Sequence, residues 1–389
     1  MKREALASLD ESVTLRREDV CSVLGVPYDA AQWNDWRWQM RHRLTRLEQF
    51  ERLLDLTESE RRGLLLASEK FSVAVTPQFA MLFDPTDPGC PIRRQVVPVA
   101  DELVVAPEDM ADPCGEDRAT VVEGLVHRYP DRVLFLVLDT CAAYCRYCTR
   151  SRLVSQGELE PLGRRVEEAL SYLREHTEVR DVLLSGGDPL LMSDHSLDQI
   201  LGRIAAIPHI EFLRIGTRIP AFLPQRITPE LVAVLRKHRV WLSVHFCHPK
   251  ELTPEVAEAC DLLADGGIPL GCQTVLLRGV NDSAEVLRDL MHGLLKLRIR
   301  PYYLYQCDPV VGTGHLRTSV GEGIHLMAAL RGYTTGYAVP TYVVDAPGGG
   351  GKIPIQAETL VGHEDGIWKV RNWEGKIYSY VDPAETGRS

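Results

Sequence analysis

The sequence lacks the features of a membrane, secreted or nucleic-acid-binding protein. No apolar run among its 389 residues reaches the roughly 20 residues needed to cross a bilayer, and the first residues lack the apolar core of a signal peptide. The 44 basic residues are outnumbered by 54 acidic ones, and a net charge of −10 argues against nucleic acid or an anionic membrane as the main partner. The 45% hydrophobic content suffices for a large core and an accessory region.

Cysteine is also sparse, with ten residues in the whole chain, which is too few for a disulfide scaffold. Seven of the ten are scattered, and we expect them to be free thiols in a reducing cytoplasm. These seven are Cys21, Cys90, Cys114, Cys247, Cys260, Cys272 and Cys307. The other three stand together. No second CxxC pair accompanies them, although paired motifs are typical of four-ligand zinc sites.

The three grouped cysteines are Cys141, Cys145 and Cys148, directly after the apolar run Val133–Leu138. Three thiolates on one loop can hold three irons of a cubane [4Fe–4S] cluster and leave the fourth iron open to a small chelating molecule. The missing second pair favours this interpretation over zinc. A zinc-binding scaffold without catalysis remains the alternative at this point.

Strand-like and helix-like segments alternate from Arg132 onward. Helix N-cap signals at Thr228, Thr253 and Ser283 support the alternation. The expected strands are Val133–Leu138, Asp181–Leu184, Glu211–Ile215, Trp241–Phe246, Leu270–Leu276 and Pro301–Tyr305. Six such units predict parallel strands with right-handed crossovers and place a site at the carboxyl ends of the strands.

The part of the chain before about Thr120 is predicted to be mostly helical. Apolar residues recur at helical spacing over Trp36–Leu54 and Ser59–Phe71. The acidic segment Asp101–Asp117 is interrupted by prolines and predicts a surface loop.

Glycine runs mark two further candidate positions. The second expected strand leads into Gly186-Gly187-Asp188, where glycine lets the backbone approach a ligand closely, although such a segment is also an ordinary turn. Four glycines precede Lys352, and a desolvated lysine can form a Schiff base with an aldehyde such as pyridoxal phosphate. A P-loop is excluded, because it would need glycine in place of Ala346. A flexible loop with a solvated lysine is the alternative.

These motifs, taken together and in this order, resemble those of the radical S-adenosylmethionine superfamily and, within it, the lysine 2,3-aminomutase family. The resemblance covers roughly residues 30 to 380. It is carried by Cys141–Cys148, Gly186–Asp188, Trp33–Gln39, His127–Arg132, Tyr302–Asp308 and Pro347–Lys352.

The resemblance implies an α/β fold, an open partial (β/α)6 radical-SAM barrel rather than the eight-unit barrel that length alone permits. We expect a helical N-terminal region over residues 1–120, the barrel over 121–330, and a C-terminal segment with the lysine loop that binds pyridoxal phosphate (PLP) over 331–389.

The resemblance also implies three cofactors, a [4Fe–4S] cluster, S-adenosyl-L-methionine and pyridoxal 5′-phosphate. The implied cluster ligands are Cys141, Cys145 and Cys148. The implied S-adenosylmethionine (SAM) contacts are Gly186, Gly187, Asp188, His245 and Gln273. For pyridoxal phosphate they are the catalytic Lys352 with Arg128 and Arg132. The implied substrate contacts are Arg150 for the α-carboxylate, and Asp308 and Asp345 for a side-chain ammonium.

The activity implied is that of an isomerase. A 5′-deoxyadenosyl radical takes a hydrogen from the β-carbon and the amino group moves from the α- to the β-carbon. L-lysine is the expected substrate, because both aspartates are retained where relatives acting on glutamate carry non-acidic residues. Arginine is the alternative, because Gly314 stands where the lysine enzyme usually has Glu and would leave room for a longer side chain. A lysine attached to another molecule, as in a protein-modification pathway, is a further alternative.

The resemblance implies an electron donor such as flavodoxin or ferredoxin, a homo-oligomer and a cytoplasmic location. Members of the family often continue into a Cys-rich tail that binds zinc at a subunit contact. No such tail follows here, which puts structural zinc and the usual tetramer in doubt.

Overall fold

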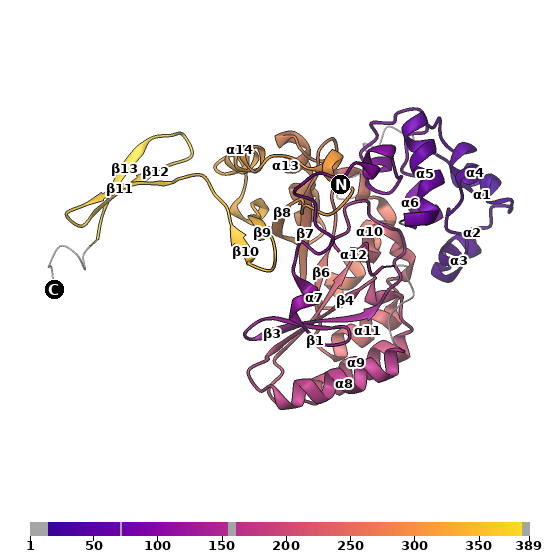
Figure 1. The fold of residues 1–389 in the computed structure, drawn as a ribbon, viewed down its shortest axis with the longest axis horizontal. Helices are drawn as coiled ribbons and strands as arrows, with labels where there is room; N and C mark the ends of the chain where they lie inside the picture. Colours follow the sequence, from indigo (N-terminus) through magenta and orange to yellow (C-terminus); the bar gives the residue numbers. More distant parts are fainter. Residues whose placement is uncertain (1–14, 71, 155–160, 383–389) are drawn as a thin grey trace.

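The protein is described by a computed structural model that covers residues 15–70, 72–154 and 161–382 (Figure 1). Its main element is a ten-stranded sheet whose strands neighbour one another in chain order. The strands are β1 (Thr120–Val122), β2 (Leu125–Tyr129), β3 (Arg132–Leu138), β4 (Asp181–Gly186), β5 (Phe212–Thr217), β6 (Trp241–Val244), β7 (Leu270–Leu276), β8 (Arg300–Gln306), β9 (Thr341–Ala346) and β10 (Gly351–Pro354). Strands β3 to β9 run parallel, and β1, β2 and β10 are antiparallel to their neighbours.

All six expected parallel strands are present, each within two residues of its predicted ends. The prediction missed β9, a seventh parallel strand that pairs with β8, and the antiparallel β10 that follows it. The lysine loop is therefore a hairpin turn inside the main sheet. The boundary expected between the barrel and the C-terminal segment lies at residue 331. Strands β9 and β10 follow that boundary, but they belong to the main sheet.

Helices follow the strands and connect one parallel strand to the next. They are α8 (Leu162–Glu175), α9 (Asp194–Ala205), α10 (Ile219–Phe222), α11 (Pro229–Lys237), α12 (Pro254–Asp265), α13 (Ala284–Lys296) and α14 (Val320–Leu330). The predicted N-caps are confirmed: the side chains of Thr228, Thr253 and Ser283 each accept a hydrogen bond from a backbone N–H of the first helical turn.

The two faces of the sheet differ in burial, as β7 illustrates. Alternate residues from Leu270 to Leu276 are buried, whereas Gly271, Gln273 and Val275 between them are partly exposed. Successive side chains of a strand point to opposite faces. One face therefore packs against the helices in the main hydrophobic core, and the other lines an open interior.

The N-terminal region is helical, as expected, and lies at one end of the molecule (Figure 1). Its helices are α1 (Arg17–Leu24), α2 (Ala30–Trp33), α3 (Trp36–Arg41), α4 (Leu47–Glu51), α5 (Glu58–Lys70) and α6 (Pro77–Ala80). The short helix α7 (Glu116–Ala119) lies apart from them, against β2. The helical spacing predicted over Trp36–Leu54 corresponds to two short helices, α3 and α4, and not to one continuous helix. Leu44 instead forms a β-bridge with Val75, and the Gln49 side chain accepts hydrogen bonds from the backbone of the residues before α4, which starts a new helix there.

The prediction of a surface loop over Asp101–Asp117 is incomplete, because part of this segment packs against other parts of the chain. Met110 forms a parallel bridge with Val310, and the carbonyl of Pro113 accepts a hydrogen bond from the N–H of Gly348 at 3.0 Å. A Cβ on Gly115 would lie 2.9 Å from the backbone nitrogen of Gly349. The segment is thus packed against the glycine loop and forms one wall of the candidate site.

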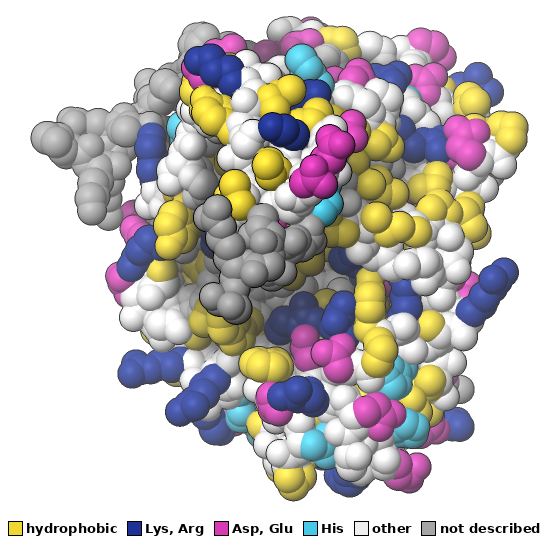
Figure 2. All heavy atoms as spheres, turned by 90° about the vertical axis from the view of Figure 1, so that its left-hand side faces the viewer, with side chains coloured by type: hydrophobic (Ala, Val, Ile, Leu, Met, Phe, Trp, Pro, Cys, Tyr) yellow, Lys and Arg dark blue, Asp and Glu magenta, His cyan; other side chains and the backbone are white. Residues whose placement is uncertain are grey.

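A separate three-stranded sheet lies at the opposite end from the N-terminal helices and projects from the body (Figure 1). It consists of β11 (Leu360–Glu364), β12 (Ile367–Arg371) and β13 (Ile377–Val381), all antiparallel. Every residue of β13 is exposed. Figure 2, which views the molecule from this side, shows hydrophobic side chains among Lys, Arg, Asp and Glu on the surface. No helix in the described part of the chain is both long and apolar enough to span a membrane.

Candidate active site

The candidate residues gather at the carboxyl ends of the parallel strands, as the alternation predicts. The cysteine loop follows β3, Asp188 follows β4, His245 follows β6 and Asp308 follows β8. Asp345 lies near the end of β9. The candidates fall into two groups, which we call the cluster side (Cys141, Cys145, Cys148, Tyr147 and Arg218) and the lysine side (Arg128, Asp308, Asp345 and Lys352).

The cysteine loop is held in place by two backbone contacts with the N-terminal region. The N–H of Tyr144 donates to the carbonyl of Ala74 at 3.1 Å, and the N–H of Arg146 donates to that of Gln95 at 2.9 Å. The Arg43 guanidinium donates to the carbonyl of Cys141 at 2.7 Å. The loop that carries all three cysteines is therefore fixed by the chain itself.

The three thiols are free and mutually close enough to interact electrostatically. Burial, with the neighbouring charges of Asp188, Cys148 and Cys145, raises the pKa of Cys141 well above its ordinary value. Burial and Cys145 raise the pKa of Cys148 to about 11. Three thiols on one short loop are a donor set that a metal cluster would convert to thiolates.

Arg218 joins the cysteine loop to the ends of β5 and β6. Its Nη1 donates to the Sγ of Cys145 at 2.8 Å and to the hydroxyl of Tyr147 at 2.5 Å. The Tyr147 hydroxyl also lies 2.9 Å from Nε2 of His245 and 3.1 Å from Sγ of Cys247. The cluster side is thus one connected hydrogen-bond network.

Gly186 and Gly187 are required by the packing of β3 against β4. A Cβ on Gly186, whose φ is +123°, would lie 2.1 Å from the carbonyl oxygen of Leu138, and one on Gly187 would lie 2.2 Å from that of Thr140. The close approach that the sequence predicted is therefore, in part, an approach between two backbone segments. Contact of these glycines with S-adenosylmethionine stays a prediction.

The carboxylate of Asp188 is buried and its acceptors are already used. It accepts from the Thr217 hydroxyl at 2.8 Å, from the N–H of Leu190 at 3.1 Å and from the N–H of Arg218 at 2.7 Å. Burial raises its pKa to about 6 despite these bonds. In this structure the aspartate fastens the end of β4 to the end of β5, and direct contact with a ligand stays a prediction.

His245 and Gln273 both keep polar groups free toward the interior. Burial and the charge of Arg218 lower the pKa of His245 well below its ordinary value, so the ring is neutral. Its Nε2 contacts Tyr147 and Cys247, while its Nδ1 has no hydrogen bond within the described chain. The Gln273 amide likewise makes none there. Both groups are available for a ligand.

The lysine side is built by the β9–β10 hairpin, in which Lys352 pairs directly with Asp345. Lys352 Nζ donates to Oδ2 of Asp345 at 3.0 Å, and Arg128 Nη2 donates to Oδ1 of the same carboxylate at 3.2 Å. Arg128 also donates to the carbonyls of Gly349 and Cys114. One buried carboxylate is therefore shared by two cations.

Arg132 lies farther out than Arg128. Its guanidinium carbon is 3.8 Å from the centre of the Tyr129 ring, and its Nη1 donates to Asp131. The Tyr129 hydroxyl accepts a hydrogen bond from the backbone N–H of Lys352 at 3.1 Å. Arg132 is thus near the lysine loop, although its side chain is 39% exposed and turned toward solvent.

Asp308 differs from Asp345 because its carboxylate makes no hydrogen bond with the described residues. Burial, and next the charge of Asp345, raises its pKa to about 7, against which Lys352, Arg128 and Arg150 act. Its carboxylate, that of Asp345 and the thiol of Cys114 lie within 4.8 Å of one another. Asp308 is therefore an uncompensated acid inside the site.

Arg150 is held by Glu116, a residue of the acidic segment. Its Nε donates to both oxygens of Glu116 at 3.0 and 3.1 Å, and its Nη2 donates to Oε1 at 2.6 Å. Nη1 reaches the hydroxyl of Ser185 at 3.5 Å. A guanidinium has five N–H donors, so donors on Nη1 and Nη2 remain for a second carboxylate.

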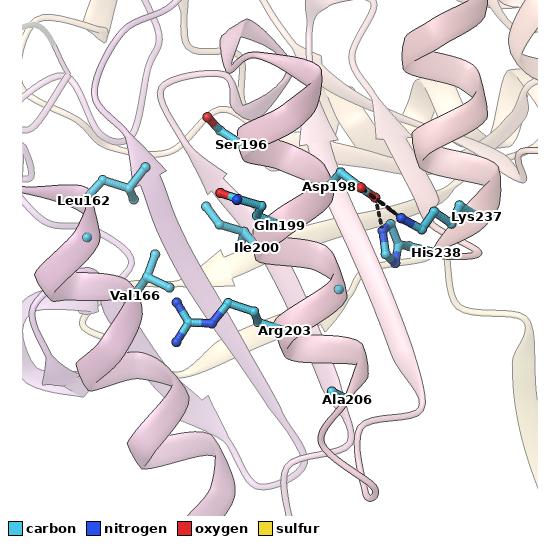
Figure 3. Close-up of a pocket in the computed structure, with 12 residues that line it drawn as sticks. Leu162, Val166, Ser196, Asp198, Gln199, Ile200, Arg203, Ala206, Lys237 and His238 are labelled. Carbon is cyan, nitrogen blue, oxygen red and sulfur yellow. Dashed lines mark hydrogen bonds and ion pairs between the residues drawn. The ribbon is translucent and has the colours of Figure 1, made fainter.

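Sequence reasoning missed Glu116, Tyr129, Tyr147 and Arg218. Tyr129 and Tyr147 lie inside the segments His127–Arg132 and Cys141–Cys148, but no spacing singles them out there, and Glu116 and Arg218 lie outside every motif. Each contacts a residue far away in the sequence, so the signal needed to find them was the fold. A pocket also lies elsewhere, in a groove on the outside of the molecule that is lined by α8, α9 and the end of α11. Figure 3 shows Asp198 on its wall, paired with Lys237 and His238. That groove lies in the helical layer, apart from the strand ends.

Comparison with known proteins agrees with this geometry. The sequence model of the radical SAM superfamily matches residues 135–291, and that described as lysine-2,3-aminomutase matches residues 327–388. The chain is 50% identical to L-lysine 2,3-aminomutase of Clostridium subterminale, over 91% of this chain and 85% of that one. The chain belongs to the lysine 2,3-aminomutase family. A second L-lysine 2,3-aminomutase, from Fusobacterium nucleatum, is 49% identical over 90% of this chain and 83% of its own.

Other members of the lysine 2,3-aminomutase family are more distant. Glutamate 2,3-aminomutase of Clostridioides difficile is 40% identical over 96% of this chain and 88% of its own. Among solved structures, a radical SAM methyltransferase from Sphaerobacter thermophilus covers 84% of this chain and 92% of its own, at 16% identity and a TM-score of 0.41, a likeness on which we build nothing.

Membership of the lysine 2,3-aminomutase family implies a [4Fe–4S] cluster and S-adenosylmethionine, and pyridoxal phosphate is characteristic of it. The residues present fit these groups. The three thiols suit iron, and the free Nδ1 of His245 and amide of Gln273 suit a polar ligand. The side chain of Lys352 is 31% exposed, so its amine is accessible to an aldehyde cofactor.

Proposed function

We propose that this protein is an amino acid 2,3-aminomutase and that its substrate is L-lysine. The observation that carries the proposal is the surroundings of Asp308. Its carboxylate senses the charges of Asp345, Lys352, Arg128 and Arg150, which come from four separate segments of the chain. A lysine-loop amine, a carboxylate-binding guanidinium and an unpaired acid thus meet in one place. The family membership supports the same reaction.

When bound, the cluster with S-adenosylmethionine would supply a 5′-deoxyadenosyl radical, and pyridoxal phosphate an aldehyde for the amino group. Cys141, Cys145 and Cys148 would hold the cluster. Gly186, Gly187, Asp188, His245 and Gln273 would line the S-adenosylmethionine site. Lys352 would carry the aldehyde cofactor with Arg128 and Arg132.

Arg150 would bind the α-carboxylate of the substrate. Glu116 occupies Nε and one edge of the guanidinium, which fixes its plane and leaves donors on Nη1 and Nη2. A carboxylate bound by a guanidinium through two parallel hydrogen bonds is both strong and directional. Arg150 would therefore set the orientation of every amino acid substrate at its α-carbon.

Asp308 and Asp345 would bind the distal cation of the substrate. Asp345 is already neutralised by Lys352 and Arg128, so Asp308 supplies the uncompensated charge. A carboxyl whose pKa is raised first by burial and next by a neighbouring carboxylate is stabilised in its charged form by any cation placed between the two. This favours a basic substrate over glutamate or alanine.

The proposal is tested by anaerobic incubation of the reconstituted protein with a panel of amino acids, followed by mass-resolved separation of the products. We expect β-lysine from L-lysine. Preferred conversion of glutamate or alanine would overturn the substrate assignment. A colourless zinc protein without aldimine absorbance would support a non-catalytic scaffold instead.

Arginine is the second candidate, and Gly314 is the position that separates it from lysine. Gly314 begins the short 3-10 helix Gly314–Leu316, and a Cβ there would meet only Nη2 of Arg317, at 3.3 Å. If arginine is the substrate, Gly314→Val should impair turnover of arginine more than that of lysine. Equal effects on both would favour lysine. A lysine attached to another molecule, as in a protein-modification pathway, would be revealed by turnover of a lysyl peptide in the same panel.

We also propose a homo-oligomer, a low-potential electron donor such as flavodoxin or ferredoxin, and a cytoplasmic location. The exposed apolar residues of β13 support an oligomer, because exposed apolar patches mark association surfaces. Ten free cysteines suit a reducing compartment. Size-exclusion chromatography with light scattering tests the first of these.

A further inference from the structure

Arg218 makes a direct contact with one of the candidate cluster cysteines. It follows β5 immediately, and its side chain is only 8% exposed. Its Nη1 donates a hydrogen bond to the Sγ of Cys145 at 2.8 Å. A cation is thus placed against a sulfur that the family uses to bind iron.

The position of Arg218 is fixed by several independent contacts. Its backbone N–H donates to Oδ2 of Asp188, and its guanidinium carbon lies 4.1 Å from the centre of the Phe222 ring. Nη1 also donates to Tyr147, and Nη2 donates to Oε1 of Gln95. The contact with Cys145 is therefore held by the surrounding structure before any cluster is bound.

The positive charge of Arg218 is only partly compensated. The nearest carboxylate is that of Glu251, which is fully buried and lies 3.5 Å from Nη2. Glu251 already accepts hydrogen bonds from Gln95 and from the backbone N–H groups of Cys247 and His248. The negative charge of Glu251 is therefore shared among these donors and Arg218, and it compensates the charge of Arg218 only in part.

The contact is shielded from water, and apolar side chains pack around the polar network that contains it. Cys145 packs against a cluster of buried residues that is separate from the main core. The members of this cluster are Tyr147, Cys247, Leu277, Val280, Cys307 and Leu316. A charge acts more strongly in such an environment than in water.

We propose that Arg218 raises the reduction potential of the cluster bound by Cys141, Cys145 and Cys148. The proposal rests on the proposed function, because it requires that cluster. Reduction adds one electron from an external one-electron donor, and no protein bond is made or broken. The added negative charge is stabilised by the guanidinium and by the N–H···S hydrogen bond, and both are known determinants of cluster potentials. Arg218 is thus a positioning and tuning residue, without contact with substrate.

Arg226 offers a matched control. It is also a buried arginine, eight positions farther along the chain, but it donates to the carbonyls of Leu190 and Met192 and to Asp194. Its guanidinium makes no contact with sulfur among these bonds. Arg226→Gln therefore removes a buried cation of the same region while leaving Cys145 untouched.

The test uses the full chain, reconstituted anaerobically with iron and sulfide and without S-adenosylmethionine. The cluster is titrated with dithionite and followed by electron paramagnetic resonance. Arg218→Gln should lower the ratio of reduced to oxidised cluster about tenfold at a fixed potential, which corresponds to a midpoint about 59 mV more negative for a one-electron couple. Arg218→Lys should shift less, and Arg226→Gln should not shift.

Glu251→Gln supplies a variant of opposite sign, because it removes the negative charge beside the guanidinium. Its midpoint should become more positive. An unchanged midpoint in Arg218→Gln overturns the proposal. If Arg218→Gln fails to bind a cluster, the midpoints of Arg218→Lys and Glu251→Gln test the proposal instead. Unchanged midpoints in both of these variants overturn the proposal. If the wild-type chain gives no [4Fe–4S] signal, it is the proposed function that fails.

Discussion

The cluster side and the lysine side of the site use charge in opposite ways. On the cluster side, one guanidinium, that of Arg218, serves a thiol, a phenol, an amide and a carboxylate, so the residues are fixed without any ligand. On the lysine side, Asp345 is shared by two cations while Asp308 has no partner in the described chain. The difference teaches that the two sides are prepared differently: the cysteine loop is fixed by contacts within the chain, whereas the carboxylate proposed to bind the substrate's cation is left without a hydrogen-bond partner among the described residues.

Removal of a cluster cysteine should have the largest effect, because it tests whether the cluster side does hold a permanent group. Cys141→Ala, Cys145→Ala and Cys148→Ala should each abolish reductive cleavage of S-adenosylmethionine. Iron content and the yield of 5′-deoxyadenosine are the measurements. Cys21→Ala, at a buried thiol of α1, is the control and should keep both. Unchanged values in the single cluster variants would show that these thiols are not the ligands.

The second prediction concerns the lysine that the hairpin presents. Borohydride reduction of the protein loaded with pyridoxal phosphate should attach the cofactor to the peptide that contains Lys352. Lys352→Arg keeps the ion pair with Asp345 but cannot form the imine, so it should remove the yellow absorbance. Lys250, an exposed lysine, should stay unlabelled. Peptide mapping by mass spectrometry decides, and labelling elsewhere would refute the assignment.

The third prediction tests the uncompensated charge directly. Asp308→Asn should raise the apparent KM for lysine by roughly a hundred- to a few-thousandfold, since breaking a buried pair costs about 3–5 kcal/mol. Formation of 5′-deoxyadenosine should remain possible. Arg150→Ala is the comparison variant and should weaken all amino acid substrates alike, because every one has an α-carboxylate. A normal KM for lysine in Asp308→Asn would argue against the two-aspartate reading.

The smallest effect is expected in the pH dependence of the ligand-free protein. The pKa of Asp308 is raised to about 7 from 3.8 by burial and by Asp345. The folded state therefore keeps a proton that the unfolded state has lost, and stability should fall as pH rises through this window. Asp308→Asn should remove that fall.

The matched control for this measurement is Asp198, in the outer groove. Its pKa is lowered by hydrogen bonds from Lys237 and His238, so its contribution has the opposite sign and is lost as pH falls. Denaturation of wild type, Asp308→Asn and Asp198→Asn at pH 5 and pH 8 compares them. If Asp308→Asn gains nothing relative to wild type at pH 8, the carboxyl is not an uncompensated charge.

The sequence predicts most of the scaffold, because its signals are local. Alternating segments identified six strands, and threonine and serine marked the starts of α11, α12 and α13. The break between α3 and α4 is not visible in the sequence, since the bridge between Leu44 and Val75 joins distant segments. The seventh parallel strand, β9, was not among the expected strands, of which Pro301–Tyr305 was the last.

The candidate site was predicted less completely than the scaffold, because only part of the site is marked by local signals in the sequence. Cysteine spacing and the glycine loop are local patterns, and the structure brings their neighbours together at the strand ends. The pairing of Arg150 with Glu116 spans 34 residues, and that of Arg218 with Cys145 spans 73. A repeating pattern of residues along the sequence does not indicate which residues far apart in the chain will pair. Asp188 was expected to face a ligand, and its bonds to Thr217 and Arg218 appear only in the fold.

The β9–β10 hairpin has a consequence for any attempt to re-engineer the length of the glycine loop. Lys352 and Asp345 are direct cross-strand partners, so both point to the same face of the sheet. An insertion or deletion in residues 347–350 must be absorbed in the turn, where Gly348 and Gly349 already adopt positive φ. If the strands slip by one residue instead, every side chain of β10 changes face. The lysine would then point away from the site while its sequence neighbours stayed the same, so loop length is as strict a requirement as the lysine itself.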